Sequence, residues 1–144
     1  MGSLNLDSPT VQSYLQILKG VITRMATNSA AVKSWCVGFV SAIVVIIADK
    51  ASAKYIWISV VPIVLFFSLD AYYLGLERLF RGLYNDSICR LHEDGVTVED
   101  AFIVSRGSSP AVLRAAAKAT VSFSIWPFYL LLEVMLVPVK AWVL

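Results

Sequence analysis

Two long apolar runs follow each other closely in this chain, and they limit its possible folds more than any other feature. The first, SWCVGFVSAIVVIIA, covers residues 34–48, and the second, YIWISVVPIVLFF, covers residues 55–67. Taken as one helix, residues 30–48 rise about 28 Å, close to the thickness of the hydrocarbon core of a bilayer. Only the hexapeptide DKASAK separates the runs. The sequence therefore predicts an antiparallel hairpin of two membrane-spanning helices.

The composition supports a membrane protein and excludes several other classes. Of the 144 residues, 58% are hydrophobic and only 15% are charged, whereas soluble domains carry roughly a quarter of charged residues. The chain contains no dinucleotide-binding, P-loop, zinc-protease or nucleophile-elbow motif. We therefore expect no enzymatic activity, no catalytic residue, no cofactor and no metal site. The net charge of +2 is too small to argue for a nucleic-acid partner.

The N-terminal segment, residues 1–29, has the pattern of an amphipathic helix. Ser8 and Pro9 are suited to the cap and the first position of a helix. After them, apolar residues recur at helical spacing: Val11, Leu15, Leu18, Ile22 and Met25. We expect this helix to lie along the membrane surface or to pack on a partner helix, and not to cross the bilayer.

The rest of the chain divides into three further segments. Residues 30–81 form the transmembrane hairpin, whose second helix extends into the cytoplasm. Residues 82–109 are a polar cytoplasmic connector, in which a capping box at Thr97 predicts a short helix. Residues 110–144 are expected to form a third transmembrane helix, because residues 119–139 would rise about 31 Å. A re-entrant or interfacial helix is the alternative for this last segment. The predicted fold class is thus an all-α membrane protein.

The distribution of basic residues predicts the orientation. Lys19, Arg24 and Lys33 precede the first apolar run, and six Lys or Arg residues lie between residues 78 and 118. Cytoplasmic loops carry an excess of such residues. We therefore expect an inner-membrane protein with a cytoplasmic N-terminus and, after three spans, an external C-terminus.

A polar stripe marks the second helix where it leaves the apolar run. Its members are spaced three, four, four and three residues apart, which places them on one helical face. They are Asp70, Tyr73, Glu77, Arg81 and Tyr84. Glu77 and Arg81 have the spacing of an ion pair within a helix. We expect the stripe to form a contact between subunits or the inner vestibule of a pore.

Two acidic residues fall within the predicted spans. An aspartate at the depth of Asp70 costs a few kcal/mol if it faces lipid, so it should face protein, water or a cation. Candidate partners are Arg78, Lys33 and Lys118, and a structural salt bridge is the alternative to a ring of Asp70 carboxylates around a pore. The same reasoning applies to Glu133, and it predicts a homo-oligomer.

The hairpin, the small size and the segment LDAYYLGLERLFRGLY together resemble small bacterial membrane proteins associated with antiphage defence, including the SLATT-type multi-helix effectors. The resemblance covers roughly residues 10–90. It implies oligomerisation and membrane disruption on activation, and it transfers no functional residue.

Two functions are compatible with these observations. In the first, the protein is an oligomeric inner-membrane effector that forms a pore or perturbs the membrane on a signal from a cytoplasmic partner. In the second, it is a non-catalytic membrane anchor or assembly subunit that recruits a soluble partner enzyme.

Overall fold

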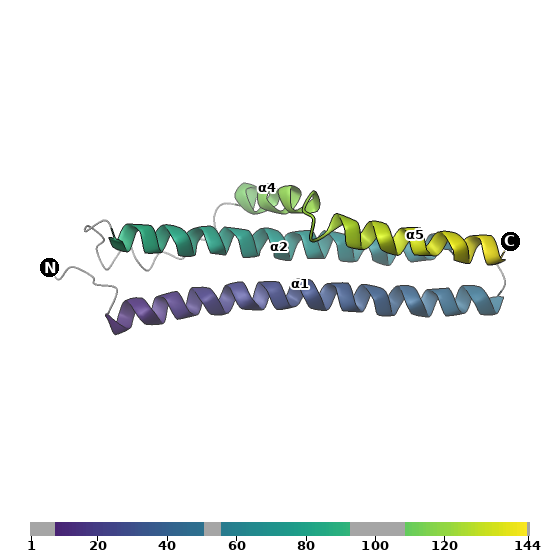
Figure 1. The fold of residues 1–144 in the computed structure, drawn as a ribbon, viewed down its shortest axis with the longest axis horizontal. Helices are drawn as coiled ribbons and strands as arrows, with labels where there is room; N and C mark the ends of the chain where they lie inside the picture. The colour runs from purple at the N-terminus through teal and green to yellow at the C-terminus, as the bar shows by residue number, and fades with distance from the viewer. Residues whose placement is uncertain (1–7, 51–55, 93–108, 144) are drawn as a thin grey trace.

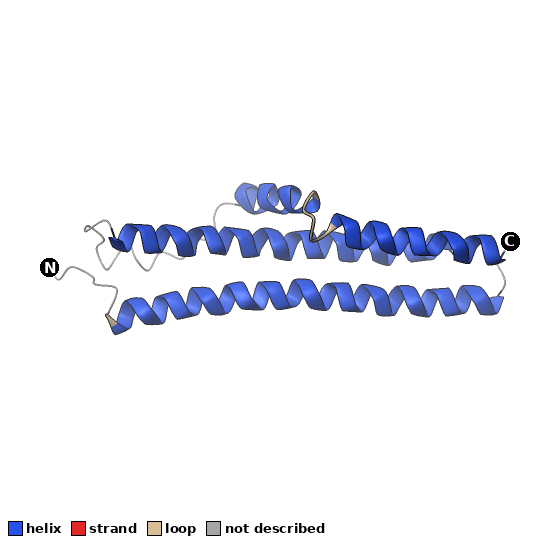
Figure 2. Ribbon diagram, viewed as in Figure 1, coloured by secondary structure: helices blue, strands red, loops and turns tan. Residues whose placement is uncertain are grey.

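A computed structural model describes residues 8–50, 56–92 and 109–143, and every regular element in them is a helix (Figure 2). The four helices are α1 (Pro9–Lys50), α2 (Ile56–His92), α4 (Ser109–Thr120) and α5 (Trp126–Val143). The predicted all-α class is confirmed for these residues. The short helix predicted at Thr97 lies outside the described residues.

Helix α1 begins at the predicted cap and continues without a break to Lys50. The backbone N–H of Val11 donates to the Ser8 hydroxyl at 3.3 Å, as an N-cap requires. Separate helices were expected on either side of residue 30, but the structure joins them. No glycine or proline lies between Gly20 and Gly38, so nothing in this stretch favours a break. The buried residues of α1 also lie on one face of the helix along its whole length. They include Val11, Leu18, Ser29, Val32, Cys36, Val40 and Ile47.

Helix α2 is also longer than the sequence suggested. It ends at His92, whereas the polar connector was expected to begin at residue 82. Gly82 is the only helix-weakening residue at that point, and one glycine in a helix costs roughly 1 kcal/mol relative to alanine. Beyond Gly82, the partly buried Tyr84, Ile88 and Leu91 continue the apolar face of the helix. The stabilisation from packing these side chains offsets the cost of Gly82, so the helix continues.

Helices α1 and α2 lie side by side and antiparallel along most of their length (Figure 1). Both are long and apolar enough to cross a membrane, judged by length and composition. We call residues 34–49, 57–69 and 126–138 the apolar half of the molecule. Residues 9–28 of α1 and 77–92 of α2 form the other end, which we call the stalk. Helix α1 begins at the stalk end, and α5 ends near the end at which α1 finishes and α2 begins (Figure 1).

The C-terminal segment is not the single helix that was expected over residues 119–139. It breaks at residues 121–125, between α4 and α5. Pro127 lies in the first turn of α5, where a missing N–H is tolerated, whereas inside one continuous helix it would leave a carbonyl without its donor and its ring would clash with that carbonyl. The turn is held by hydrogen bonds from the N–H of Ser122 to the carbonyl of Ala119 and from the N–H of Ile125 to that of Ser122, both 2.9 Å. The apolar part of α5, residues 126–138, rises about 20 Å, less than a full hydrocarbon core.

Helices α4 and α5 pack along α2, and α4 does so unusually closely at Gly75. A Cβ atom added to Gly75 would lie 2.6 Å from the backbone nitrogen of Ala116 and 2.8 Å from its Cα. Backbone atoms cannot move aside as the end of a flexible side chain can. Gly75 therefore permits the contact between α2 and α4.

We expect Gly75→Ala to destabilise the protein by about 1–3 kcal/mol, because the added methyl group forces α4 away from α2. Gly82→Ala is a matched control on the same helix, since a Cβ there meets nothing within 4 Å. It should be neutral or stabilising by up to about 1 kcal/mol. Thermal unfolding in detergent, followed by circular dichroism, measures both. Equal stability of the two variants would contradict the close packing at Gly75.

Candidate functional site

The interface between α1 and α2 is apolar over most of its length, and Asp70 places a fully buried carboxylate near its middle. Fully buried Leu18, Cys36 and Ile47 lie on α1, and Ile63 is 3% exposed on α2. Asp70 occupies the same face of α2, two helical turns from Ile63, and its exposure is 0%. A carboxylate in such a place must be paired, because an isolated buried charge is very costly.

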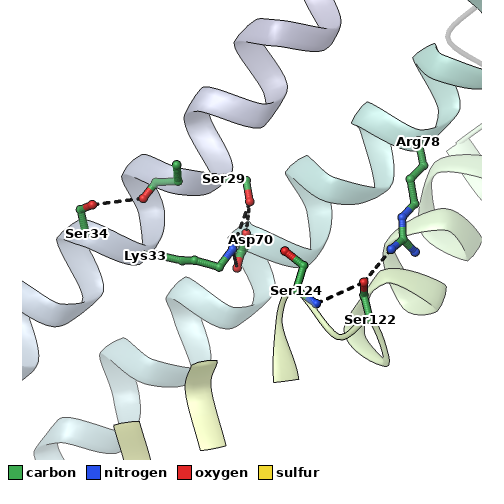
Figure 3. Close-up of polar contacts among 8 residues, drawn as sticks. Ser29, Lys33, Ser34, Asp70, Arg78, Ser122 and Ser124 are labelled. Carbon is green, nitrogen blue, oxygen red and sulfur yellow. Dashed lines mark hydrogen bonds and ion pairs between the residues drawn. The ribbon is translucent and has the colours of Figure 1, made fainter. Parts of the chain in front are cut away.

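Two side chains of α1 hold the Asp70 carboxylate (Figure 3). The Ser29 hydroxyl donates a hydrogen bond to Oδ1. The Lys33 ammonium lies 2.5 Å from Oδ2 and also donates to the Ser29 Oγ at 3.2 Å. Ser29 and Lys33 are one helical turn apart, so a single face of α1 presents both to Asp70. We call Ser29, Lys33 and Asp70 the Asp70 cluster.

The two charges of the cluster differ in their access to solvent. The Asp70 side chain is fully buried, whereas the Lys33 side chain is 20% exposed. Lysine can also extend its long stem to bring the ammonium to a polar surface. Loss of Asp70 therefore leaves a cation that can find water, while loss of Lys33 leaves a carboxylate that cannot.

Helix α5 contacts the hairpin next to this cluster through Tyr129. The Tyr129 ring packs edge-on against Phe67 of α2, with ring centroids 5.3 Å apart, and the residue is 4% exposed. Tyr129 belongs to the same buried cluster as Cys36 of α1 and Ala71 of α2, the residue next to Asp70. All three long apolar segments thus meet at the level of Asp70.

A second polar contact joins α2 to the turn between α4 and α5. The Arg78 Nη2 donates to the Ser122 hydroxyl at 2.6 Å (Figure 3). Among the three partners considered for Asp70, Lys33 is confirmed, and Arg78 instead holds Ser122. This contact fixes the turn that Pro127 creates, so it sets where α5 begins along α2.

The predicted ion pair between Glu77 and Arg81 is confirmed. Both the Nε and the Nη2 of Arg81 lie 2.8 Å from the Glu77 Oε1. The Arg81 side chain is 62% exposed and the Glu77 side chain 12% exposed. Because solvent reaches the exposed Arg81, a pair four residues apart on a helix contributes only about 0.3–0.5 kcal/mol, so it orients Arg81 more than it stabilises the fold.

The predicted stripe therefore splits into parts with different surroundings. Asp70 is buried inside the chain, Glu77 is nearly so, Tyr73 and Tyr84 are half-buried, and Arg81 is exposed. Contacts within one chain already occupy the Asp70 carboxylate. A role for the stripe between subunits stays a prediction.

Glu133, the other predicted site residue, is exposed on α5, away from the Asp70 cluster. The sequence reasoning did not identify Ser29 or Tyr129 as neighbours of Asp70. Ser29 could have been found, because it is a polar residue at a position of α1 in phase with Met25, Val32 and Cys36. No local signal places Tyr129, which reaches Asp70 only through the packing of α5.

The chain matches no protein-family model, no curated protein and no solved structure. The resemblance to SLATT-type effectors therefore stays a hypothesis based on layout. Within residues 8–50, 56–92 and 109–143, no group of three or more His, Cys, Asp or Glu side chains could hold a metal ion.

We expect the two single substitutions at the ion pair to be unequal and their combination to be mild. Lys33→Met should cost about 3–5 kcal/mol, because it leaves the fully buried Asp70 carboxylate without a counter-ion. Asp70→Leu should cost less, since the Lys33 ammonium can reach solvent. The double variant removes both charges and should recover most of the loss. Unfolding in detergent, followed by circular dichroism, gives the free energies, and simple additivity of the two single costs would contradict the pairing.

Proposed function

We propose that the protein is a membrane effector: copies of the chain assemble in the inner membrane, with stalks in the cytoplasm, and the assembly opens a polar pathway or otherwise perturbs the bilayer. The activity is non-enzymatic and consists of a change in the permeability of the membrane.

The distribution of exposed apolar side chains supports insertion of the apolar half. Many large apolar residues there are more than half exposed, among them Trp35, Val45, Trp57, Val61, Leu131 and Met135. In the stalk, Ile17 is the only large apolar residue so exposed among those that the structure describes. Exposing so large an apolar surface to water is unfavourable, so we expect lipid to cover the apolar half. The stalk exposes little apolar surface and can lie in water.

The observation that carries the effector proposal is the position of Glu133. It is exposed on α5 between exposed Leu131 and Met135, in the apolar half. A charged side chain near the centre of a bilayer costs about 2.5–3.5 kcal/mol on insertion scales and more in other estimates. A second copy of the chain, or water between several copies, removes this cost. Acidic side chains grouped in this way also favour cations in a pathway.

The cytoplasmic orientation of the stalk follows from the excess of basic residues in the segments that flank the apolar runs. A signal from a cytoplasmic partner would act on the stalk. The resemblance to antiphage effectors suggests that the response is a defence response.

We expect induced expression of the native chain to depolarise the inner membrane, as measured with a potential-sensitive dye. Glu133→Leu should abolish the depolarisation at equal protein level, because it removes the only described acidic side chain exposed on α5. Leu131→Met is the matched control, an exposed apolar residue two positions away, and it should behave as the native chain. The proposal is wrong if native protein leaves the potential unchanged, or if Glu133→Leu depolarises as strongly as the native chain.

The length of the stalk favours a second candidate function, that of a membrane anchor for a soluble partner. Residues 9–28 of α1 rise about 30 Å, enough to present a helical pair well beyond the membrane surface. An anchor would retain a soluble partner on purification and would cause no depolarisation when expressed. The dye measurement therefore separates the two candidates.

A further inference from the structure

The stalk contains a cleft between α1 and α2 that neither the Asp70 cluster nor the effector proposal uses. It has a volume of about 350 Å³. Its lining residues are Lys19, Ile22 and Thr23 of α1 and Arg81, Tyr84 and Asn85 of α2. Lys19 is ten residues from Ser29, about 15 Å along the helix, so the cleft is separate from the buried ion pair. Its volume lies at the lower end of the range for small-molecule sites.

The polar groups that line the cleft are mostly hydrogen-bond donors. The Lys19 ammonium has three donors and forms no ion pair with a described residue. Arg81 has five N–H donors: the one on Nε donates to the Glu77 Oε1, and Nη2 forms an ion pair with the same oxygen. The two N–H groups on Nη1 remain available, and the Glu77 contact fixes the plane of the guanidinium. Asn85 adds an amide, and the lining contains no acidic residue.

The basic character continues onto the neighbouring surface of α1. A shallow hollow there shares Lys19 and Thr23 with the cleft and adds Arg24, Thr27 and Asn28. It also contains no carboxylate. Lys19, Arg24 and Arg81 thus bring three cations to the cleft and the adjoining hollow, and among the described residues Glu77 is the carboxylate that pairs with one of them, Arg81.

We propose that this cleft binds a small phosphate-bearing anion, held by Lys19 and Arg81 from opposite helices. Planar guanidinium and compact ammonium groups are the side chains that recognise phosphate oxygens, and charge-assisted hydrogen bonds of this kind are about twice as strong as neutral ones. The bound anion bridges α1 and α2, so it holds the two helices of the stalk together. The anion is either a soluble phosphate compound or the headgroup of a lipid.

Isothermal titration of the full chain in phosphatidylcholine nanodiscs with inorganic pyrophosphate tests the proposal. Native protein should show saturable binding that weakens with added salt. Lys19→Gln should weaken binding by about tenfold or more, as expected for the loss of a hydrogen bond to a charged group. Arg90→Gln is the matched control, an exposed cation of α2 that does not line the cleft, and it should leave binding unchanged. Absence of saturable binding, or equal weakening by both variants, would overturn the proposal.

A second arm distinguishes the two sources of phosphate. Replacing phosphatidylcholine by phosphatidylglycerol should suppress pyrophosphate binding if lipid headgroups occupy the cleft, and should leave it unchanged if the ligand is soluble. Lys19 lies fourteen residues from Lys33, about 21 Å along α1, which favours the soluble ligand. The titration does not depend on a membrane potential. Absence of pyrophosphate binding would therefore overturn the anion site without affecting the effector proposal, and absence of depolarisation would overturn the effector proposal without affecting the anion site.

Discussion

The ion pair between Lys33 and Asp70 is the constraint on which the rest of the structure depends. A fully buried carboxylate cannot turn toward lipid or apolar side chains without a large cost, so α2 must keep one face toward Ser29 and Lys33 of α1. That requirement fixes the rotation of both helices about their axes. The connection of only five residues between α1 and α2 limits sliding of one helix along the other. Together they define which residues of α2 remain free to contact α4 and α5.

Those remaining contacts use a second face of α2. Gly75 admits the backbone of α4 at close range, Arg78 holds the turn after α4, and Phe67 packs on Tyr129 of α5. Each contact requires that Asp70 already points toward α1. The stalk and the apolar half are parts of the same two helices, so no loop separates the stalk from the Asp70 cluster.

The sequence was informative where a single physical effect dominated. Apolar runs bounded by a short polar connection predicted the hairpin, and the four-residue spacing predicted the pair between Glu77 and Arg81. Prediction was wrong where two effects competed. The change from mixed to apolar composition near residue 30 suggested a boundary, but a change in composition does not break a helix in a stretch that lacks glycine and proline, as residues 21–37 do. In the last segment, hydrophobicity suggested one long helix, and the backbone chemistry of Pro127 interrupted it. The position of Tyr129 beside Asp70 depends on tertiary packing, which no local pattern encodes.

Helices α1 and α2 form one continuous hairpin, from the stalk through the apolar half, with the Asp70 cluster at its middle. Pulsed electron paramagnetic resonance measures this arrangement, with spin labels at exposed positions 16 and 86 of the stalk and Cys89 replaced by serine, while the buried Cys36 stays. A continuous hairpin gives one narrow distance, as expected for neighbouring helices whose axes lie about 8–10 Å apart. In Lys33→Met the distribution should be broader, because the buried carboxylate has lost its counter-ion. A long or broad distribution in the native chain, as a separate helix on the membrane surface would give, would rule out the continuous hairpin.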